Sequence, residues 1–187
     1  MESDDKPIKV FAETAEKQLH FLEEIVKDSK KPSALLILDI FSNAERRFEE
    51  GKIDDAILRL YRLVELMAQD RLYNKHHIVV SDVKIEQIPE CLKTEFLRSH
   101  RSQRDGKIKI PQTAAFRLLD AMNDDLGKVY TSNESDFLKI QSSRNYSYLA
   151  HGFDSSKETT YMKLKEFILK LNVFNADSAP KFPKIEL

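Results

Sequence analysis

The amino-acid sequence predicts an all-α fold, a helical bundle with a less regular middle segment. Apolar residues recur at steps of three and four along several stretches, which is the period of an amphipathic helix. Hydrophobic residues make up 41% of the 187 residues, so one core of ordinary size can form. We therefore expect a single domain over residues 1–174 and an extended tail over 175–187, where Pro180 and Pro183 oppose regular structure.

Three helices are expected in the first part of the chain. Residues 8–26 carry one helical stripe, and a second helix begins at Ser33 and continues to Phe48. Gly51 stands where a left-handed residue can end a helix, and residues 53–68 follow at once with a third stripe. Because so short a turn joins them, the second and third helices should be antiparallel neighbours.

Four more helices are expected over residues 85–98, 111–122, 134–150 and 157–171, the first of them weak in its pattern. Gly152 should stop the helix over 134–150. In the middle segment, residues 77–80 and 107–110 are candidates for two short extended pieces.

Composition restricts the classes of function. The formal net charge is -1, so nucleic-acid binding would need a local basic patch. One cysteine, Cys91, excludes an internal disulfide, fits a reducing compartment and is expected to be a small buried side chain. The N-terminus lacks the apolar core of a signal peptide, and the longest apolar run, 34–38, is too short to span a membrane. We expect a soluble, cytoplasmic protein with no membrane contact.

Neither a cofactor nor a metal site is expected. The four glycines lie far apart, whereas loops that bind nucleotide phosphates need clustered glycines. The acidic pairs Asp54–Asp55 and Asp124–Asp125 lack histidine support, and we interpret both as structural.

Arg144 and His151 are the strongest candidates for chemistry. In one continuous helix they would lie within about 20° of the same face and about 10.5 Å apart along the axis. Gly152 would place His151 in the last turn, where the helix dipole favours the imidazolium. A guanidinium suits a phosphate, and a histidine can exchange a proton near neutral pH. With Asn145 positioning either group, these residues suit metal-independent RNA cleavage by the RNA's own 2′-hydroxyl.

The spacing alone is weak support, because Arg71 precedes His76 and His77 at similar separations. Those pairs would lie about 140° and 120° apart around a helix, so they are not aligned. The structural alternative is an ordinary helical scaffold. In it Arg144 is salt-bridged, with Glu65 as one candidate partner, and His151 merely caps the carbonyls of its own helix.

A family resemblance adds to this interpretation. Residues 144–152, RNYSYLAHG, resemble the signature of HEPN ribonucleases, in which a polar residue follows an arginine and a histidine comes four to six residues further on. Residues 43–71 resemble the helical pair of CRISPR-associated HEPN proteins of type III systems. The resemblance covers about residues 34–172.

The resemblance implies a metal-independent endoribonuclease that cuts single-stranded RNA as a homodimer in antiviral defence. Arg144 and His151 would be catalytic and Asn145 supportive. The geometry also favours a dimer, because an arginine and a histidine about 10 Å apart on one stripe cannot easily bracket one phosphate. The alternative is a non-catalytic HEPN-like module for dimerisation or for nucleotide or partner binding.

Such relatives generally carry a CARF sensor domain with alternating strands and helices, a pattern that this sequence lacks. A CARF-type partner would therefore act in trans, or in cis from a longer chain.

Two further RNA contacts are candidates. Arg101 and Arg104 belong to the basic segment 93–109, which could follow an RNA backbone or be a solvated loop. Tyr148 could stack on a base or pack in the core or a dimer interface.

Overall fold

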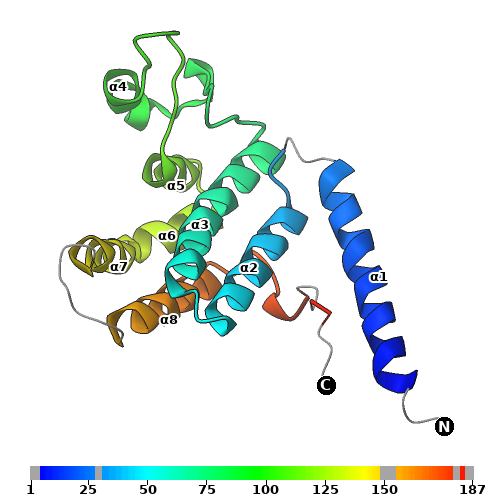
Figure 1. The fold of residues 1–187 in the computed structure, drawn as a ribbon. Helices are drawn as coiled ribbons and strands as arrows, with labels where there is room; N and C mark the ends of the chain where they lie inside the picture. The colour runs from blue at the N-terminus through cyan, green and yellow to red at the C-terminus, as the bar shows by residue number, and fades with distance from the viewer. Residues whose placement is uncertain (1–4, 28–30, 148–154, 179–181, 184–187) are drawn as a thin grey trace.

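The computed structural model describes residues 5–27, 31–147, 155–178 and 182–183; for 5–7, 143–147, 155–157 and 177 it describes the backbone alone. Within these ranges it holds eight α-helices and two short 3-10 turns, and no strand (Figure 1). The prediction of an all-α fold is therefore confirmed. Among the described residues no helix is long and apolar enough to cross a membrane.

Helix α3 (Ile53–His76) is the central element, with ten buried side chains. It packs against α2 (Ala34–Glu49), α5 (Gln112–Ala121) and α8 (Ser155–Lys170). Ser33 caps α2 by accepting a hydrogen bond from the Leu36 amide at 3.2 Å. Gly51 has a φ of 73°, so the chain reverses between α2 and α3 as the sequence predicts. The two helices run antiparallel as neighbours (Figure 1).

Helix α3 is longer than its apolar stripe predicts, because it continues past Ala68 to His76. Its last turn is held by Asp124, whose carboxylate accepts hydrogen bonds from Lys75 Nζ at 2.7 Å and His76 Nε2 at 3.0 Å. Arg71 Nε lies 3.9 Å from the same carboxylate. Burial opposes ionisation of Asp124, but the hydrogen bonds outweigh it and lower its pKa to about 2. The buried carboxylate joins the end of α3 to the start of α6 (Asp125–Ser132), where it also accepts from the Leu126 amide at 3.0 Å.

Helix α6 was not predicted. Its apolar residues Leu126 and Tyr130 are buried, and Gly127 lies against the end of α5. A Cβ at Gly127 would stand 2.2 Å from the Asp120 amide nitrogen, so only glycine permits this approach. Tyr130 stacks on Phe116 of α5 with ring centroids 3.8 Å apart, which joins the two helices on their buried side.

The middle segment contains η1 (Ile85–Gln87) and α4 (Glu90–Ser99). Neither predicted extended piece forms a strand. Instead Ile108 makes isolated antiparallel bridges with Val83 and with Arg101, and the Ile110 amide donates to the Val80 carbonyl at 2.9 Å. Cys91 is exposed, so the prediction of a buried thiol was wrong. It lies in the first turn of α4, a short helix whose buried side chain is Phe96.

Helices α7 (Glu134–Ser147) and α8 complete the bundle (Figure 1). Phe137 of α7 lies 5.1 Å from Phe167 of α8 between ring centroids. On its other side, α8 joins α2, since Tyr161 stacks on Phe48 at 4.0 Å and donates to the Glu45 carboxylate. Burial, and then the bond to this carboxylate, raise the pKa of Tyr161.

The first and last elements lie against α2. Helix α1 (Asp5–Lys27) packs on it along one side, and the segment after α8 returns past it. Phe174 meets Phe41 edge-on at 5.0 Å, and the Arg46 guanidinium lies 4.7 Å from the Phe182 ring. The 3-10 turn η2 (Ala176–Ser178) lies within the predicted tail. The domain boundary at residue 174 stays a prediction.

Candidate functional site

Arg144 and Asn145 lie in the final turns of α7, where the described backbone is helical through Ser147. Their side chains lie outside the description, and Tyr148 and His151 lie wholly outside the described residues. The helical setting expected for the start of the motif is thus present. The separation and orientation of the Arg144 and His151 side chains stay predictions.

The packing of α7 fixes the position of Arg144 and Asn145 relative to the bundle. Phe137 and Ile140 are buried and hold α7 to the bundle, with Phe137 6.0 Å from the Tyr61 ring of α3 and 5.1 Å from Phe167 of α8. Arg144 follows Phe137 by seven residues and Ile140 by four, so its backbone position continues the same helical stripe. The core contacts of α7 therefore fix the backbone of residue 144 near the end of a helix that packs against α8.

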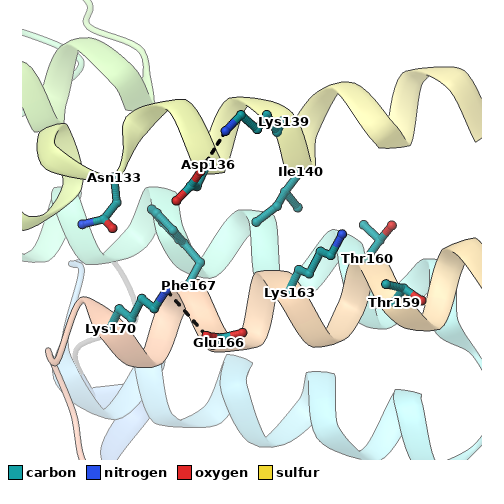
Figure 2. Close-up of a pocket in the computed structure, with 10 residues that line it drawn as sticks. All are labelled: Asn133, Asp136, Lys139, Ile140, Thr159, Thr160, Lys163, Glu166, Phe167 and Lys170. Carbon is teal, nitrogen blue, oxygen red and sulfur yellow. Dashed lines mark hydrogen bonds and ion pairs between the residues drawn. The ribbon is translucent and has the colours of Figure 1, made fainter.

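A groove of about 540 Å³ lies between α7 and α8 and ends one turn before Arg144 in sequence (Figure 2). Its floor is apolar and its rim is polar. The lining residues are Asn133, Asp136, Lys139, Ile140, Thr159, Thr160, Lys163, Glu166, Phe167 and Lys170.

The charges on the groove are partly neutralised by local ion pairs. Lys139 Nζ lies 3.1 Å from Asp136, and Lys170 Nζ lies 3.5 Å from Glu166, both one helical turn away (Figure 2). Lys163 is exposed and makes no ion pair with the residues that the structure describes. A lysine that is not already paired can contact a phosphate at little cost. In the sequence, the polar face of residues 157–171 is the feature that could have indicated this groove.

Arg101 and Arg104 lie on the connection between α4 and α5, and both are exposed. Arg101 Nε donates to the Gly106 carbonyl at 3.3 Å within the same turn. Figure 1 shows this connection at the opposite end of the molecule from α8. Within one chain the structure does not bring these arginines to the described part of the motif, residues 144–147. Two lysines of the segment are paired with acids, Lys107 with Asp82 at 3.2 Å and Lys109 with Asp105 at 2.7 Å.

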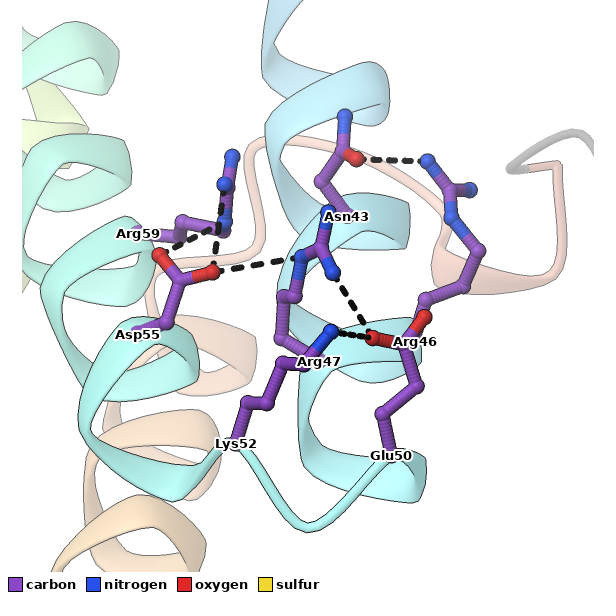
Figure 3. A network of polar contacts seen from close by, with 7 residues as sticks. All are labelled: Asn43, Arg46, Arg47, Glu50, Lys52, Asp55 and Arg59. Atoms are coloured by element: carbon purple, nitrogen blue, oxygen red, sulfur yellow. Dashed lines mark hydrogen bonds and ion pairs between the residues drawn. The ribbon is translucent and has the colours of Figure 1, made fainter.

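A second concentration of charge joins α2 to α3 (Figure 3). Arg47 contacts Glu50 at 2.7 Å and Asp55 at 3.2 Å, and Arg59 reaches the same Asp55 at 3.2 Å. Arg46 donates to Asn43 at 2.6 Å. Each of these arginines contacts a polar side chain within the chain, so the network stabilises the pairing of α2 with α3. Asp55 is structural, as predicted.

The other arginine–histidine spacing, Arg71 with His76, is structural too, because both side chains meet Asp124. Glu65, the predicted candidate partner for Arg144, contacts Arg62 at 2.8 Å and Gln69 at 3.0 Å. Among the side chains described, no three histidines, cysteines or acids lie close enough to hold a metal ion.

Comparison with known proteins identifies the family. Residues 25–175 match the family described as the Csm6 HEPN domain. The matched range includes the helical pair α2–α3, the groove between α7 and α8, and the whole of RNYSYLAHG. Neither the curated proteins nor the solved structures contain a significant match. The match covers most of the chain, its fold is all-α as the family requires, and the chain therefore belongs to the Csm6-type, CRISPR-associated HEPN domain family.

Proposed function

We propose that this protein is an endoribonuclease that cleaves single-stranded RNA without a metal ion, at a site completed by two copies of the chain. The observation that carries the proposal is the family match over residues 25–175, because HEPN domains are generally ribonucleases and the match includes the Arg144–His151 motif. The setting would be CRISPR-linked antiviral defence. A CARF-type sensor would control activity in cis or in trans.

The reaction is a transesterification within the RNA. The 2′-hydroxyl loses its proton while its oxygen bonds to the adjacent phosphorus, and the bond from phosphorus to the 5′-oxygen breaks as that oxygen gains a proton. The products are a 2′,3′-cyclic phosphate and a 5′-hydroxyl. Arg144 would stabilise the charge on the phosphorus-bound oxygens, and His151 would transfer a proton or stabilise the same charge. Asn145 would position one of the two.

Two copies are needed if the arginine and histidine lie about 10 Å apart, as a continuous helix requires. A two-fold axis near the end of α7 would place the motif of each copy opposite the other. The groove between α7 and α8 supports RNA binding near the motif, since its lining ends at Ile140, one turn before residue 144, and includes Lys163. RNA phosphates next to the cut bond would contact that lysine.

The test is cleavage of an unstructured RNA in the presence of EDTA, with the ends of the products identified. We expect cyclic phosphate and 5′-hydroxyl ends, and loss of cleavage in the double variant Arg144→Ala, His151→Ala. A matched control removes one arginine and one histidine elsewhere, Arg62→Ala with His20→Ala, both exposed, and should cleave normally. Undiminished cleavage by the motif variant would refute the site. A wild-type chain that binds RNA without cutting it would favour the non-catalytic module.

A further inference from the structure

Helix α1 carries an apolar seam that the other described residues leave largely uncovered. Its positions alternate by four and three residues, which is the heptad spacing of a coiled coil. The seam consists of Ile8, Ala12, Ala15, Leu19, Leu22 and Val26. Four of these side chains are large and remain exposed, Ile8 at 69%, Leu19 at 58%, Leu22 at 39% and Val26 at 70%.

The attachment of α1 to the bundle uses a different side of the helix. Gln18 is buried, and Phe11, Phe21 and Ile25 are half-buried, on the side that packs on α2. A continuous exposed apolar strip beside an already packed face is a mark of an interaction surface. Two adjacent apolar faces on one helix indicate two partners, of which α2 is the first.

The exposed seam has the local shape that helix pairing requires. A hollow of about 420 Å³ on α1 is lined by Leu19, Leu22, Glu23, Val26 and Lys27. The first four of these stand at positions i, i+3, i+4 and i+7, the diamond of residues that accepts one side chain of a facing helix. The hollow therefore has the residue pattern that a side chain from a second helix would fill.

We propose that the outer seam of α1 binds the α1 of a second copy in an antiparallel pair. In this register Ile8 faces Val26, Ala12 faces Leu22, and Ala15 faces Leu19, and the second half of the seam repeats these pairs. Each leucine thus meets an alanine, which lets large and small side chains interdigitate. A parallel pair would instead stack each alanine on its own copy and leave gaps.

Charge supports the same direction. Lys9 follows Ile8, and Glu23 follows Leu22, so the two occupy the same flanking position at opposite ends of the seam. Antiparallel pairing brings Lys9 of each copy near Glu23 of the other, twice per dimer, and brings Glu16, midway along the same flanking position, near its own copy once. The two attractive pairs outnumber the one repulsive contact, and the seam is self-complementary in shape, which is why a second copy is the occupant we infer.

This interface is separate from the one proposed for catalysis. Figure 1 shows α1 on the other side of α2 and α3 from α7. The family match begins at residue 25, so nearly all of α1 precedes it. Pairing through α1 therefore leaves the end of α7 free, and it neither requires nor excludes RNA cleavage.

The first experiment measures molar mass by light scattering across a dilution series. We expect Leu19→Glu with Leu22→Glu to lower the mass about two-fold, with the helical content by circular dichroism retained because both positions are exposed. Val10→Glu is the matched control, since Val10 is 55% exposed on α1 but off the seam, and it should keep the wild-type mass. Equal masses for the wild type and the seam variant would overturn the proposal. So would a monomeric wild type that sediments with anionic lipid vesicles.

The second experiment tests the register and does not depend on an acidic substitution. In a Cys91→Ser background, chains with Ala12→Cys are mixed with chains with Leu22→Cys and oxidised. We expect a disulfide-linked heterodimer, because the antiparallel pair places these positions opposite each other. A disulfide formed readily by Leu22→Cys chains alone, or no heterodimer in the mixture, would refute the antiparallel pair.

Discussion

The carboxylate of Asp124 should be a major source of stability, and Asp124→Asn tests this directly. The side chain is fully buried and ionised among Lys75, His76 and Arg71. Its pKa falls from 3.8 to about 2, which corresponds to roughly 2 kcal/mol of folding free energy at neutral pH. Asparagine keeps the shape and can still accept from the Leu126 amide, so the variant removes the charge and retains the cap.

The pH dependence of the unfolding free energy tests the role of the Asp124 charge more specifically than the loss of stability at one pH. Because the folded pKa is the lower one, this stability is present above about pH 4 and is lost as the pH falls toward 2. The difference between the wild type and Asp124→Asn should therefore shrink from roughly 2 kcal/mol at pH 7 to roughly 1 kcal/mol at pH 3. Urea unfolding at both pH values measures it. Asp125→Asn is the control, since that side chain is 95% exposed. A difference below about 0.5 kcal/mol at pH 7, or one that does not change with pH, would refute the reasoning.

Three further predictions concern packing and RNA binding. Gly127→Ala should lower the free energy of unfolding by about 1–3 kcal/mol, because its Cβ would meet the α5 backbone at 2.2 Å. Lys128→Ala is the control and should change the midpoint of urea unfolding little. Lys163→Gln should weaken binding of single-stranded RNA and lower the slope of log affinity against log salt by about 0.7, and an unchanged slope would remove Lys163 from the RNA path. Arg101→Ala with Arg104→Ala should also weaken binding and flatten its salt dependence if that loop follows the RNA; unchanged binding would show that it does not.

Local pattern was sufficient for much of the fold. The stripes of α2 and α3 and the glycine between them predicted an antiparallel pair, because periodicity and a left-handed residue act over a few neighbouring positions. The same holds for the family, since RNYSYLAHG and residues 43–71 are contiguous segments whose resemblance needs no tertiary information. The catalytic roles of Arg144, Asn145 and His151 remain predictions from that resemblance.

Only the tertiary structure decided the features that depend on distant partners. Helix α6 is short and contains Gly127, a residue that disfavours a helix in sequence. In the fold, glycine is required there because the α5 backbone packs directly against it. Asp124 was expected to be structural, but its role in holding the end of α3 depends on residues almost fifty positions away.

The exposure of Cys91, the groove that holds Lys163, and the uncovered seam of α1 likewise depend on which face of each helix the bundle covers. An amphipathic pattern identifies an apolar face, but it does not say which element packs on that face. The sequence by itself therefore determined most of the helices, though not α6, and the family of this protein. The packing of those helices decided which of its charged and apolar side chains remain available to RNA or to a second copy.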